Sequence, residues 1–503
     1  MSFTSLQFIF VFLPAVYAIY VLASRIGGRQ WAITVLGVSS LVFYAMFGAQ
    51  LLLVLLISMI FNFTVGNVLA CLTAHPKVSR NLLLGAIIAN LGMLGYLKYT
   101  NFFIDVLNQA AHTSIGHMDI AVPLGVSFFT FVQIGYLIDS YNGQLIKHDF
   151  ARYLVFTAFF PAVTAGPLVM QREMMEQLSG PGPRAFDPKR VLIGLTMFAM
   201  GLFKKVVMAD AIAPFADKVF GGVHSGMAVD AGTAWIGALC YALQLYFDFS
   251  GYSDMAIGLA TIFGIKLPLN FDSPFKATNI SDFWRRWHMT MTRFFTAYVY
   301  SGLAMWGMRR SMASRVGKFG RYLLVAAIPS IVTFLVAGVW HGSGWTYVVY
   351  GVMHGLAIAT FLGWREFSKV KLPTPLAWLI TMAMVVSGLV MFRAPDVPTA
   401  IAMLGQMWGI FHAVPGAELI SIDTATAMSM IVIMGAVTLL LPNTQQILHH
   451  EWPVVDTKPE DAEQAAGLVA WRPSFSVSLI TACVFTIGIT SIGSSSGFLY
   501  YKF

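Results

Sequence analysis

The chain has 503 residues, of which 57% are hydrophobic and only 11% are charged. Soluble domains carry about 25% charged residues, and a soluble protein of this length could not bury so much apolar surface. A bilayer-spanning helix needs about 20 predominantly apolar residues, and such runs recur along almost the whole chain. The composition therefore excludes a soluble protein and predicts an all-α, polytopic integral membrane protein.

The formal net charge of +8 does not indicate nucleic-acid binding, because no basic domain stands apart from the apolar runs. Lysines and arginines in cytoplasmic loops, facing anionic lipid, account for this excess. The three cysteines, Cys71, Cys240 and Cys483, lie in apolar surroundings without CxxC spacing, so they indicate neither a disulfide framework nor a zinc site.

The first apolar run, Phe8–Ala23, has no basic residue before it and is followed immediately by Arg25 and Arg29. A cleavable signal peptide carries its positive charge in front of the apolar run. We therefore expect a retained first span whose N-terminus is extracytoplasmic. Basic and non-basic loops then alternate after the next two runs, as the positive-inside rule requires.

Further runs bring the expected number of transmembrane spans to roughly a dozen, with re-entrant or interfacial helices among them. These runs are Trp31–Phe47, Leu51–Leu72, Leu82–Leu97, Ile120–Ile138, Tyr153–Leu168, Val191–Met208, Ala231–Gly264, Phe294–Met308, Leu323–Trp340, Trp345–Leu362, Leu376–Phe392, Ala425–Leu441 and Phe475–Ile492. The run Ala231–Gly264 is long enough for a broken or paired segment. We interpret residues 1–503 as one integral membrane domain with a soluble loop at about 443–473.

The segment Lys266–Arg293 is too polar to span a membrane, yet too rich in aromatic residues for an ordinary loop. Ser281 or Asp282 is a credible N-cap for a helix here. One helical face would then carry residues at positions i, i+3, i+4 and i+7: Trp284, Trp287, His288 and Met291. The other positions hold arginines that could bind phosphates or anchor the helix at the lipid interface: Arg285, Arg286 and Arg293.

His341 lies at or near the end of an apolar span, in the sequence Trp340-His341-Gly342. An ionisable residue inside a membrane segment is costly, so a functional role competes with that of a packed or cavity-lining histidine. An imidazole can take a proton from a hydroxyl that attacks a thioester. The sequence thus makes His341 a candidate for acyl-transfer chemistry.

His354 is a third histidine in these segments, and three histidines raise the question of a metal site. No HExxH motif, cysteine pair or close histidine–carboxylate spacing accompanies them, so we predict none. We expect His354 to pack or form a hydrogen bond between helices.

Asp248 and Asp254 also lie in a largely apolar stretch. Buried carboxylates need partners, so these residues should line a polar cavity, pair with lysine or arginine, or stabilise a helix break at Gly251. A structural role is as compatible with the pattern as a catalytic one.

Pieces along most of the chain resemble the membrane-bound O-acyltransferase family, in particular the bacterial branch typified by the alginate O-acetyltransferase membrane subunit. Its most specific piece is SDFWRRWH, ending at His288, followed about fifty residues later by WHG. The other pieces are FIFVFLPAVY (8–17), GYLKYTNFF (95–103), PLGVSFFTFVQIGYLIDS (123–140), FFPAVTAGPL (159–168), GLFKKVVMAD (201–210), LYFDFSGYSDMAIG (245–258), LPLNFDSPFKATNI (267–280) and FLYYKF (498–503).

The resemblance implies a curved helical bundle in which a cytoplasmic funnel and an extracytoplasmic opening meet at a catalytic histidine, here His341. His288 corresponds to the family's second characteristic histidine. Candidates for binding the substrate or acyl donor are Trp284, Arg285, Arg286, Trp287, Trp340, Asp248 and Asp254.

Members of this branch typically take an acetyl group from cytoplasmic acetyl-CoA and pass it across the membrane, usually to a partner protein or carrier that modifies polysaccharide. The resemblance therefore implies O-acetylation of an extracytoplasmic polysaccharide, such as an alginate-like exopolysaccharide, at the bacterial inner (cytoplasmic) membrane. It also implies acetyl-CoA as donor, a periplasmic acetyltransferase or esterase-like partner, and no bound cofactor.

Two segments depart from the alginate branch. Residues 295–303 replace an Arg-Asp-Tyr and an Ile-Pro-Leu-Gly-Gly element, and Ala162-Val163-Thr164 replaces a form that contains glutamine. These departures affect the inferred acceptor, the partner surface and the identity with alginate acetylation, but not the inferred class of reaction. D-alanyl transfer to teichoic acid, transfer of a longer acyl group and non-enzymatic polysaccharide transport are the alternatives, although a transporter often shows internal symmetry that this chain lacks.

Overall fold

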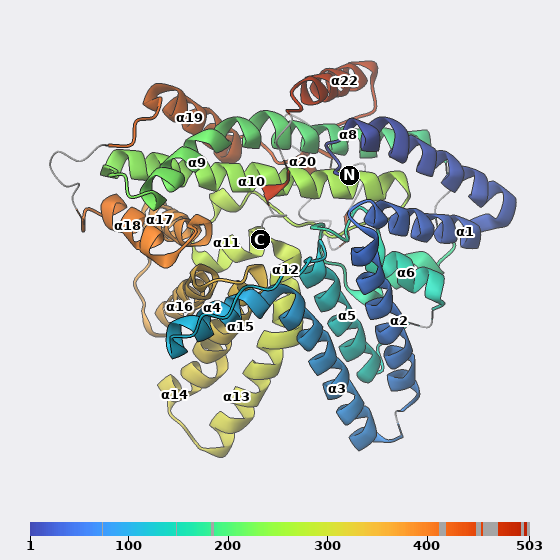
Figure 1. Cartoon of the computed structure of the whole chain (residues 1–503), viewed down its shortest axis with the longest axis horizontal. Helices are drawn as coiled ribbons and strands as arrows, with labels where there is room; N and C mark the ends of the chain where they lie inside the picture. The colour runs from blue at the N-terminus through green and yellow to red at the C-terminus, as the bar shows by residue number, and fades with distance from the viewer. Residues whose placement is uncertain are drawn as a thin grey trace.

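The computed structural model describes residues 1–72, 74–146, 148–182, 186–411, 419–448, 454–455, 471–493 and 497–499. Within these residues every regular element is a helix, as predicted (Figure 1). The helices are α1 (Leu13–Ala45), α2 (Ala49–Cys71), α3 (Pro76–Leu94), α4 (Thr100–Ala111), α5 (Val126–Tyr141), α6 (Phe150–Ala158), α7 (Gln171–Ser179), α8 (Pro188–Phe203), α9 (Asp210–His224), α10 (Ala231–Ile262), α11 (Ile280–Arg286), α12 (Met289–Phe295), α13 (Ser301–Ala313), α14 (Lys318–Tyr322), α15 (Ile328–His341), α16 (Trp345–Phe367), α17 (Thr374–Arg393), α18 (Val397–Met407), α19 (Thr424–Leu440), α20 (Thr444–Leu448) and α22 (Phe475–Thr490).

Among the described residues, seven helices are long and apolar enough to cross a membrane. The seven are Phe8–Ala45, Ala49–Cys71, Pro76–Ala111, Pro188–His224, Lys318–His341, Trp345–Phe367 and Thr374–Arg393. Several of the seven join two helices through a π-helical turn. The shorter apolar helices α18, α19 and α22 add to these. The chain is thus a multi-pass membrane protein.

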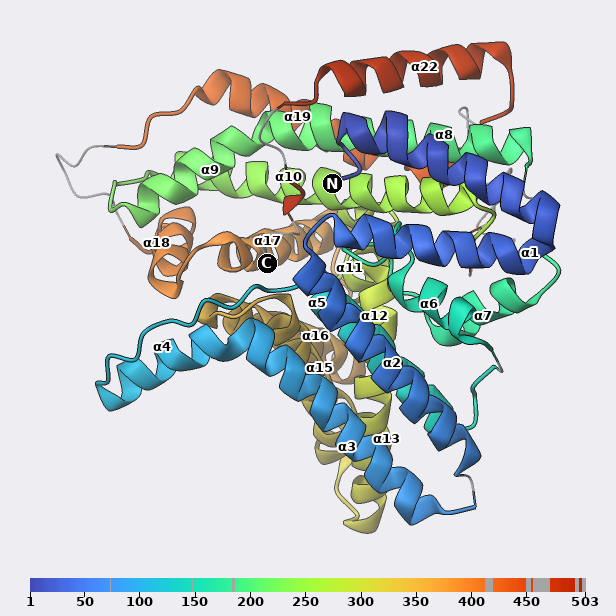
Figure 2. The same ribbon diagram turned by 45° about the vertical axis from the view of Figure 1, so that its right-hand side comes forward.

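The helices run in two main directions (Figures 1 and 2). Helices α8 and α9 follow one another end to end across one part of the molecule, α10 lies alongside both, and α22 runs beside α8. Helices α2, α3, α5 and α13 extend away from them at a steep angle. Helices α11, α12, α15 and α16 lie where the two sets meet, and this junction contains the candidate site.

Glycine pairs bring α8 and α10 into direct backbone contact. A Cβ atom added at Gly258 would lie 2.5 Å from the carbonyl oxygen of Gly194, and one added at Gly251 would lie 2.7 Å from that of Gly201. Each helix therefore carries two glycines seven residues apart, on one face. Small residues of this kind allow close packing of membrane helices, so α10 is held rigidly along α8.

Buried amides join α2, α3 and α5. Asn62 and Asn90 exchange two side-chain hydrogen bonds of 3.0 and 2.8 Å, and Asn62 also donates to Gln133. Ser58 donates to the same Gln133 oxygen at 2.7 Å. Such interhelical hydrogen bonds contribute roughly 0.6 kcal/mol each in membrane proteins, and here they fix the relative positions of three helices.

Several expected spans differ from the observed helices. The first two expected spans do not: they form the two helical arms of α1 on either side of Gly28, whose φ of +69° lets the chain fold back between them (Figure 2). The expected span Ile120–Ile138 begins as a helix only at Val126, after Gly125 at φ +72°. Helix α6 ends at Ala158, so Tyr153–Leu168 is not one helix.

The long run Ala231–Gly264 is neither broken nor paired, because α10 continues without interruption from Ala231 to Ile262 and is almost entirely buried. The segment 443–473 lies largely outside the described residues. At its described edges, Thr444, Leu448 and Trp471 are buried, and Arg472 and Pro473 are exposed. The soluble loop stays a prediction.

Candidate active site

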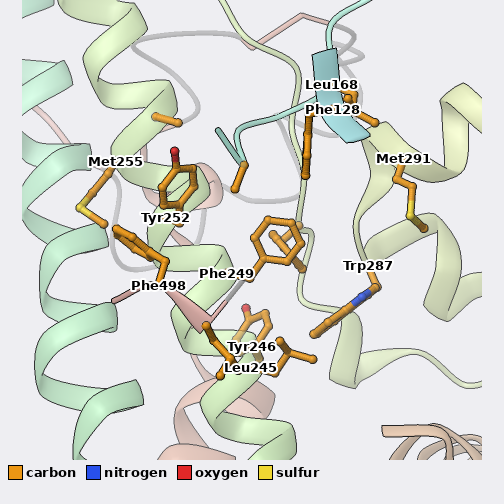
Figure 3. Close-up of a cluster of buried hydrophobic side chains, with 14 of the residues drawn as sticks. Phe128, Leu168, Leu245, Tyr246, Phe249, Tyr252, Met255, Trp287, Met291 and Phe498 are labelled. Atoms are coloured by element: carbon orange, nitrogen blue, oxygen red, sulfur yellow. The ribbon is translucent and has the colours of Figure 1, made fainter. Parts of the chain in front are cut away.

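His288 and His341 line one cavity at the junction of the two helix sets. Their ring centroids are 6.3 Å apart. The cavity has a volume of about 10 Å³, room for roughly one water molecule, and its other walls are Leu245, Phe249, Trp287, Tyr350, Leu389 and Phe392. Figure 3 shows Leu245, Phe249 and Trp287 within the surrounding aromatic and aliphatic cluster. Two imidazoles thus face a small, mostly apolar space.

His288 occupies a break between two short helices. Helix α11 begins after Asn279, whose side chain accepts the Asp282 backbone N–H, and it ends at Arg286. Trp287 is extended, and His288 adopts a left-handed conformation at φ +44° and ψ +51°. A non-glycine residue in this region costs about 1–3 kcal/mol and often marks a functional site. The break turns His288 into the cavity.

The side chain of Asn270 holds His288 in place. Its Oδ1 lies 3.0 Å from His288 Nδ1 and 2.9 Å from Thr290 Oγ1, which donates to it. Its Nδ2 donates to Ser253 Oγ at 3.1 Å, which fixes the orientation of the amide. Because Oδ1 is an acceptor, His288 carries a proton on Nδ1 and leaves Nε2 as a proton acceptor.

The predicted single helix with one aromatic stripe is therefore wrong. Helical periodicity placed Trp284, Trp287 and His288 on one face, but the chain changes direction at Trp287. Trp284 instead donates from Nε1 to His354 Nδ1 at 3.2 Å. This bond confirms the expectation that His354 connects helices.

His341 is the last residue of α15 and is 6% exposed. Its ring packs edge-on against Phe392 and Trp340, with centroid distances of 5.1 and 4.9 Å. Trp340 is itself buried against Phe128 at 5.0 Å, and so supports His341 without lining the cavity. Gly342 then leaves the helix in an extended conformation.

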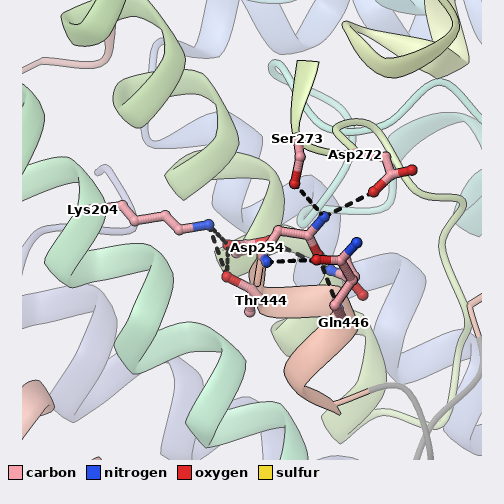
Figure 4. A network of polar contacts seen from close by, with 8 residues as sticks. Lys204, Asp254, Asp272, Ser273, Thr444 and Gln446 are labelled. Carbon is pink, nitrogen blue, oxygen red and sulfur yellow. Dashed lines mark hydrogen bonds and ion pairs between the residues drawn. The ribbon is translucent and has the colours of Figure 1, made fainter. Parts of the chain in front are cut away.

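The two candidate aspartates on α10 pair with lysines rather than lining the cavity. Lys204 and Asp254 form an ion pair of 2.6 Å, to which Thr444 is hydrogen-bonded (Figure 4). Lys205 lies 2.6 Å from Asp248. Of the roles left open for these carboxylates, pairing with lysine is the observed one, and α10 has no break at Gly251.

Of the three arginines, two are engaged and one is exposed. Arg293 donates to Glu173 at 2.9 Å. Arg286 contacts Asp282 at 3.1 Å and Asp272 at 3.6 Å. Arg285 is exposed, and no ion pair involves it within the part of the chain that the structure describes. Of the three, only Arg285 is exposed and outside these ion pairs.

No cluster of three or more histidine, cysteine, aspartate or glutamate residues suited to a metal ion occurs in the described ranges.

Comparison with known proteins places the chain in a family. The model of the membrane-bound O-acyltransferase family matches residues 87–397, more than half of the chain. The chain belongs to the membrane-bound O-acyltransferase family.

Relatives within this family include O-acetyltransferases. The chain is 36% identical to the peptidoglycan O-acetyltransferase of Helicobacter pylori over 442 residues, which cover 81% of this chain and 80% of the relative. It is 35% identical to the probable alginate O-acetylase AlgI of Pseudomonas aeruginosa, over 81% of this chain and 75% of the relative. A teichoic acid D-alanyltransferase of Streptococcus thermophilus is 28% identical over 52% of this chain and 62% of the relative. This member of the membrane-bound O-acyltransferase family is therefore an acyltransferase.

Several residues of this acyltransferase's site were not expected from the sequence. Asn270 belongs to a motif that carried the family resemblance, and its polar side chain among apolar neighbours was a signal for a role. Leu389 and Phe392 gave no signal, because they lie in an ordinary apolar span.

Proposed function

We infer that this acyltransferase moves an acetyl group from cytoplasmic acetyl-CoA across a bacterial inner membrane, for O-acetylation of an extracytoplasmic polysaccharide. A periplasmic partner protein completes the transfer, and the N-terminus of the chain is extracytoplasmic. The observation that carries this proposal is the shared cavity of His288 and His341, in a chain 36% identical to a peptidoglycan O-acetyltransferase.

The proposed chemistry needs one proton acceptor close to the thioester. His341 takes the proton from the acceptor hydroxyl while the hydroxyl oxygen attacks the acetyl carbonyl carbon. The carbon–sulfur bond then breaks, and the departing CoA thiolate takes up the proton from His341. His288, whose Nδ1 faces Asn270 Oδ1, is the second imidazole in the same cavity. No cofactor is required, because acetyl-CoA is a substrate.

Acetyl is supported by the O-acetyltransferase relatives and not by the size of the cavity. The cavity's volume of about 10 Å³ has room for roughly one water molecule. A D-alanyl group carries an ammonium, which would need a carboxylate or similar acceptor. The eight described residues that line the cavity include no carboxylate, so D-alanyl transfer is less well supported.

The test is a transfer assay in membranes that contain the full chain and its partners, with labelled acetyl-CoA. Wild type should move label to polymer, and His341→Ala should lose nearly all of this activity. His117→Ala is a matched control, because His117 is an exposed histidine that pairs with Asp105. A folded, membrane-inserted His341→Ala protein that acetylates at the normal rate would overturn the assignment.

A further inference from the structure

A lysine outside the cavity contacts the backbone of the segment that contains His341. Lys98 lies in the π-helical turn Gly95–Tyr99, between α3 and α4. Its Nζ donates to the carbonyl oxygens of Trp340 at 3.0 Å and His341 at 2.9 Å, and to Ser127 Oγ at 3.2 Å. An ammonium group has three protons to donate, and these three acceptors use all of them.

The carbonyls that Lys98 reaches are those left unpaired where α15 ends. The last four carbonyls of a helix have no partner within the helix and carry the negative end of its dipole. Since Gly342 is extended at φ −161°, no further turn of helix supplies an N–H group. Inside a membrane protein such carbonyls must be satisfied by other protein groups. A cation is the preferred partner at this helix end.

Neighbouring contacts make the attachment rigid. Tyr99 donates its hydroxyl to the carbonyl oxygen of Val339 at 2.5 Å, so two successive residues bind three successive carbonyls. Ser127 belongs to the first turn of α5, whose Gln133 is connected to α3 through the buried amides. Figure 2 shows α3 leading into α4 beside α15. The turn is therefore fixed to two helices as well as to the histidine segment.

We propose that Lys98 is a positioning residue for His341: its ammonium caps the C-terminus of α15 and so sets the direction in which the imidazole enters the cavity. This role rests on the proposed function of His341 in acyl transfer. A lysine that only anchored its helix at the lipid interface would extend toward the headgroups. Lys98 instead points inward to three protein acceptors.

The experiment compares Lys98→Met with wild type and with Lys77→Met, in membranes that contain the full chain and its partners. Lys77 is an exposed lysine at the beginning of α3, the helix that leads into the turn containing Lys98. A displacement of about 1 Å at a reacting group can reduce the rate roughly 100-fold. We expect Lys98→Met to lower kcat by about that factor while KM for acetyl-CoA stays within about twofold, and Lys77→Met to behave as wild type.

A chemical rescue separates positioning from a general loss of structure. Lys98→Cys, in a chain whose Cys71 and Cys483 are replaced by serine, is treated with bromoethylamine to restore an ammonium of nearly the same length. Activity should rise at least tenfold on aminoethylation of the same folded sample. No rise in a sample shown to be fully modified and folded would contradict the proposal, even if Lys98→Met proved unstable.

The outcomes also distinguish this inference from the function on which it rests. Normal kcat in Lys98→Met together with loss of activity in His341→Ala overturns the role of Lys98 alone. Normal activity in His341→Ala overturns the proposed function itself. Loss through KM with kcat unchanged would assign Lys98 to donor binding and would also contradict the positioning role.

Discussion

Two buried polar regions lie close to each other on α10 and its neighbours, and they are built differently. In the first, Asp248 and Asp254 each have a lysine at 2.6 Å. In the second, His288 and His341 face aromatic rings, aliphatic side chains and the amide of Asn270, while Lys98 donates to the backbone carbonyl of His341. The ion pairs neutralise charges that a membrane protein could not otherwise bury. Under the proposed function the histidines carry the proton transfer, so we interpret the first region as structural and the second as chemical.

Replacing one partner of an ion pair should have the largest effect on stability. Lys205→Met leaves Asp248, 2% exposed, without its cation, which costs about 3–5 kcal/mol. We expect a much lower Tm for the detergent-solubilised protein. Lys318→Met, which removes a pair with exposed Glu366, should cost less than about 1 kcal/mol.

The double variant Lys205→Met/Asp248→Leu tests whether the loss of stability comes from the unpaired charge of Asp248. Removing both charges should restore part of the lost stability, because an apolar pair of similar volume often replaces a buried ion pair without cost. The rest reflects Asp210, which Lys205 also contacts at 2.7 Å. If the double variant is as unstable as the single one, the buried charge of Asp248 is not the main cause of the loss.

In the chemical region, His288→Gln should reduce activity more than stability. Removing a general acid–base group costs roughly 10²–10⁴-fold in rate, and we expect about 100-fold for this second histidine. The acetyl-transfer rate and the Tm are measured on the same preparation. A fall in Tm that accounts for the whole loss of activity would make His288 a structural residue.

Part of the candidate site was predictable from the sequence alone. The histidines were found from SDFWRRWH and WHG, because specific motifs recur with a specific reaction. The break at Trp287 was not predictable, since periodicity indicates which face a residue occupies but not where a helix stops. The pairing of Lys204 with Asp254 joins residues fifty positions apart, which no local pattern reveals.

His354→Phe tests a histidine that belongs with the structural region. Trp284 Nε1 would lose its acceptor, which costs about 1–3 kcal/mol for a buried donor. The specific activity of the folded protein should stay within about threefold of wild type. A loss comparable to that of His288→Gln would move His354 into the chemical group.

Arg285→Ala should have the smallest effect. Loss of one exposed charge-assisted hydrogen bond to a phosphate of acetyl-CoA would raise KM by up to roughly tenfold, with kcat unchanged. Arg286→Ala is the matched control, because Arg286 is engaged by Asp272 and Asp282. An unchanged KM in Arg285→Ala would instead indicate a lipid anchor.

The most direct measurement of the central claim is the rate of label transfer from acetyl-CoA to polymer by His341→Gln, a substitution that keeps a polar side chain of similar size. The account predicts a fall of at least about 100-fold, as expected for loss of a general base, with an unchanged Tm. A folded His341→Gln protein that transfers acetyl at the wild-type rate would contradict it.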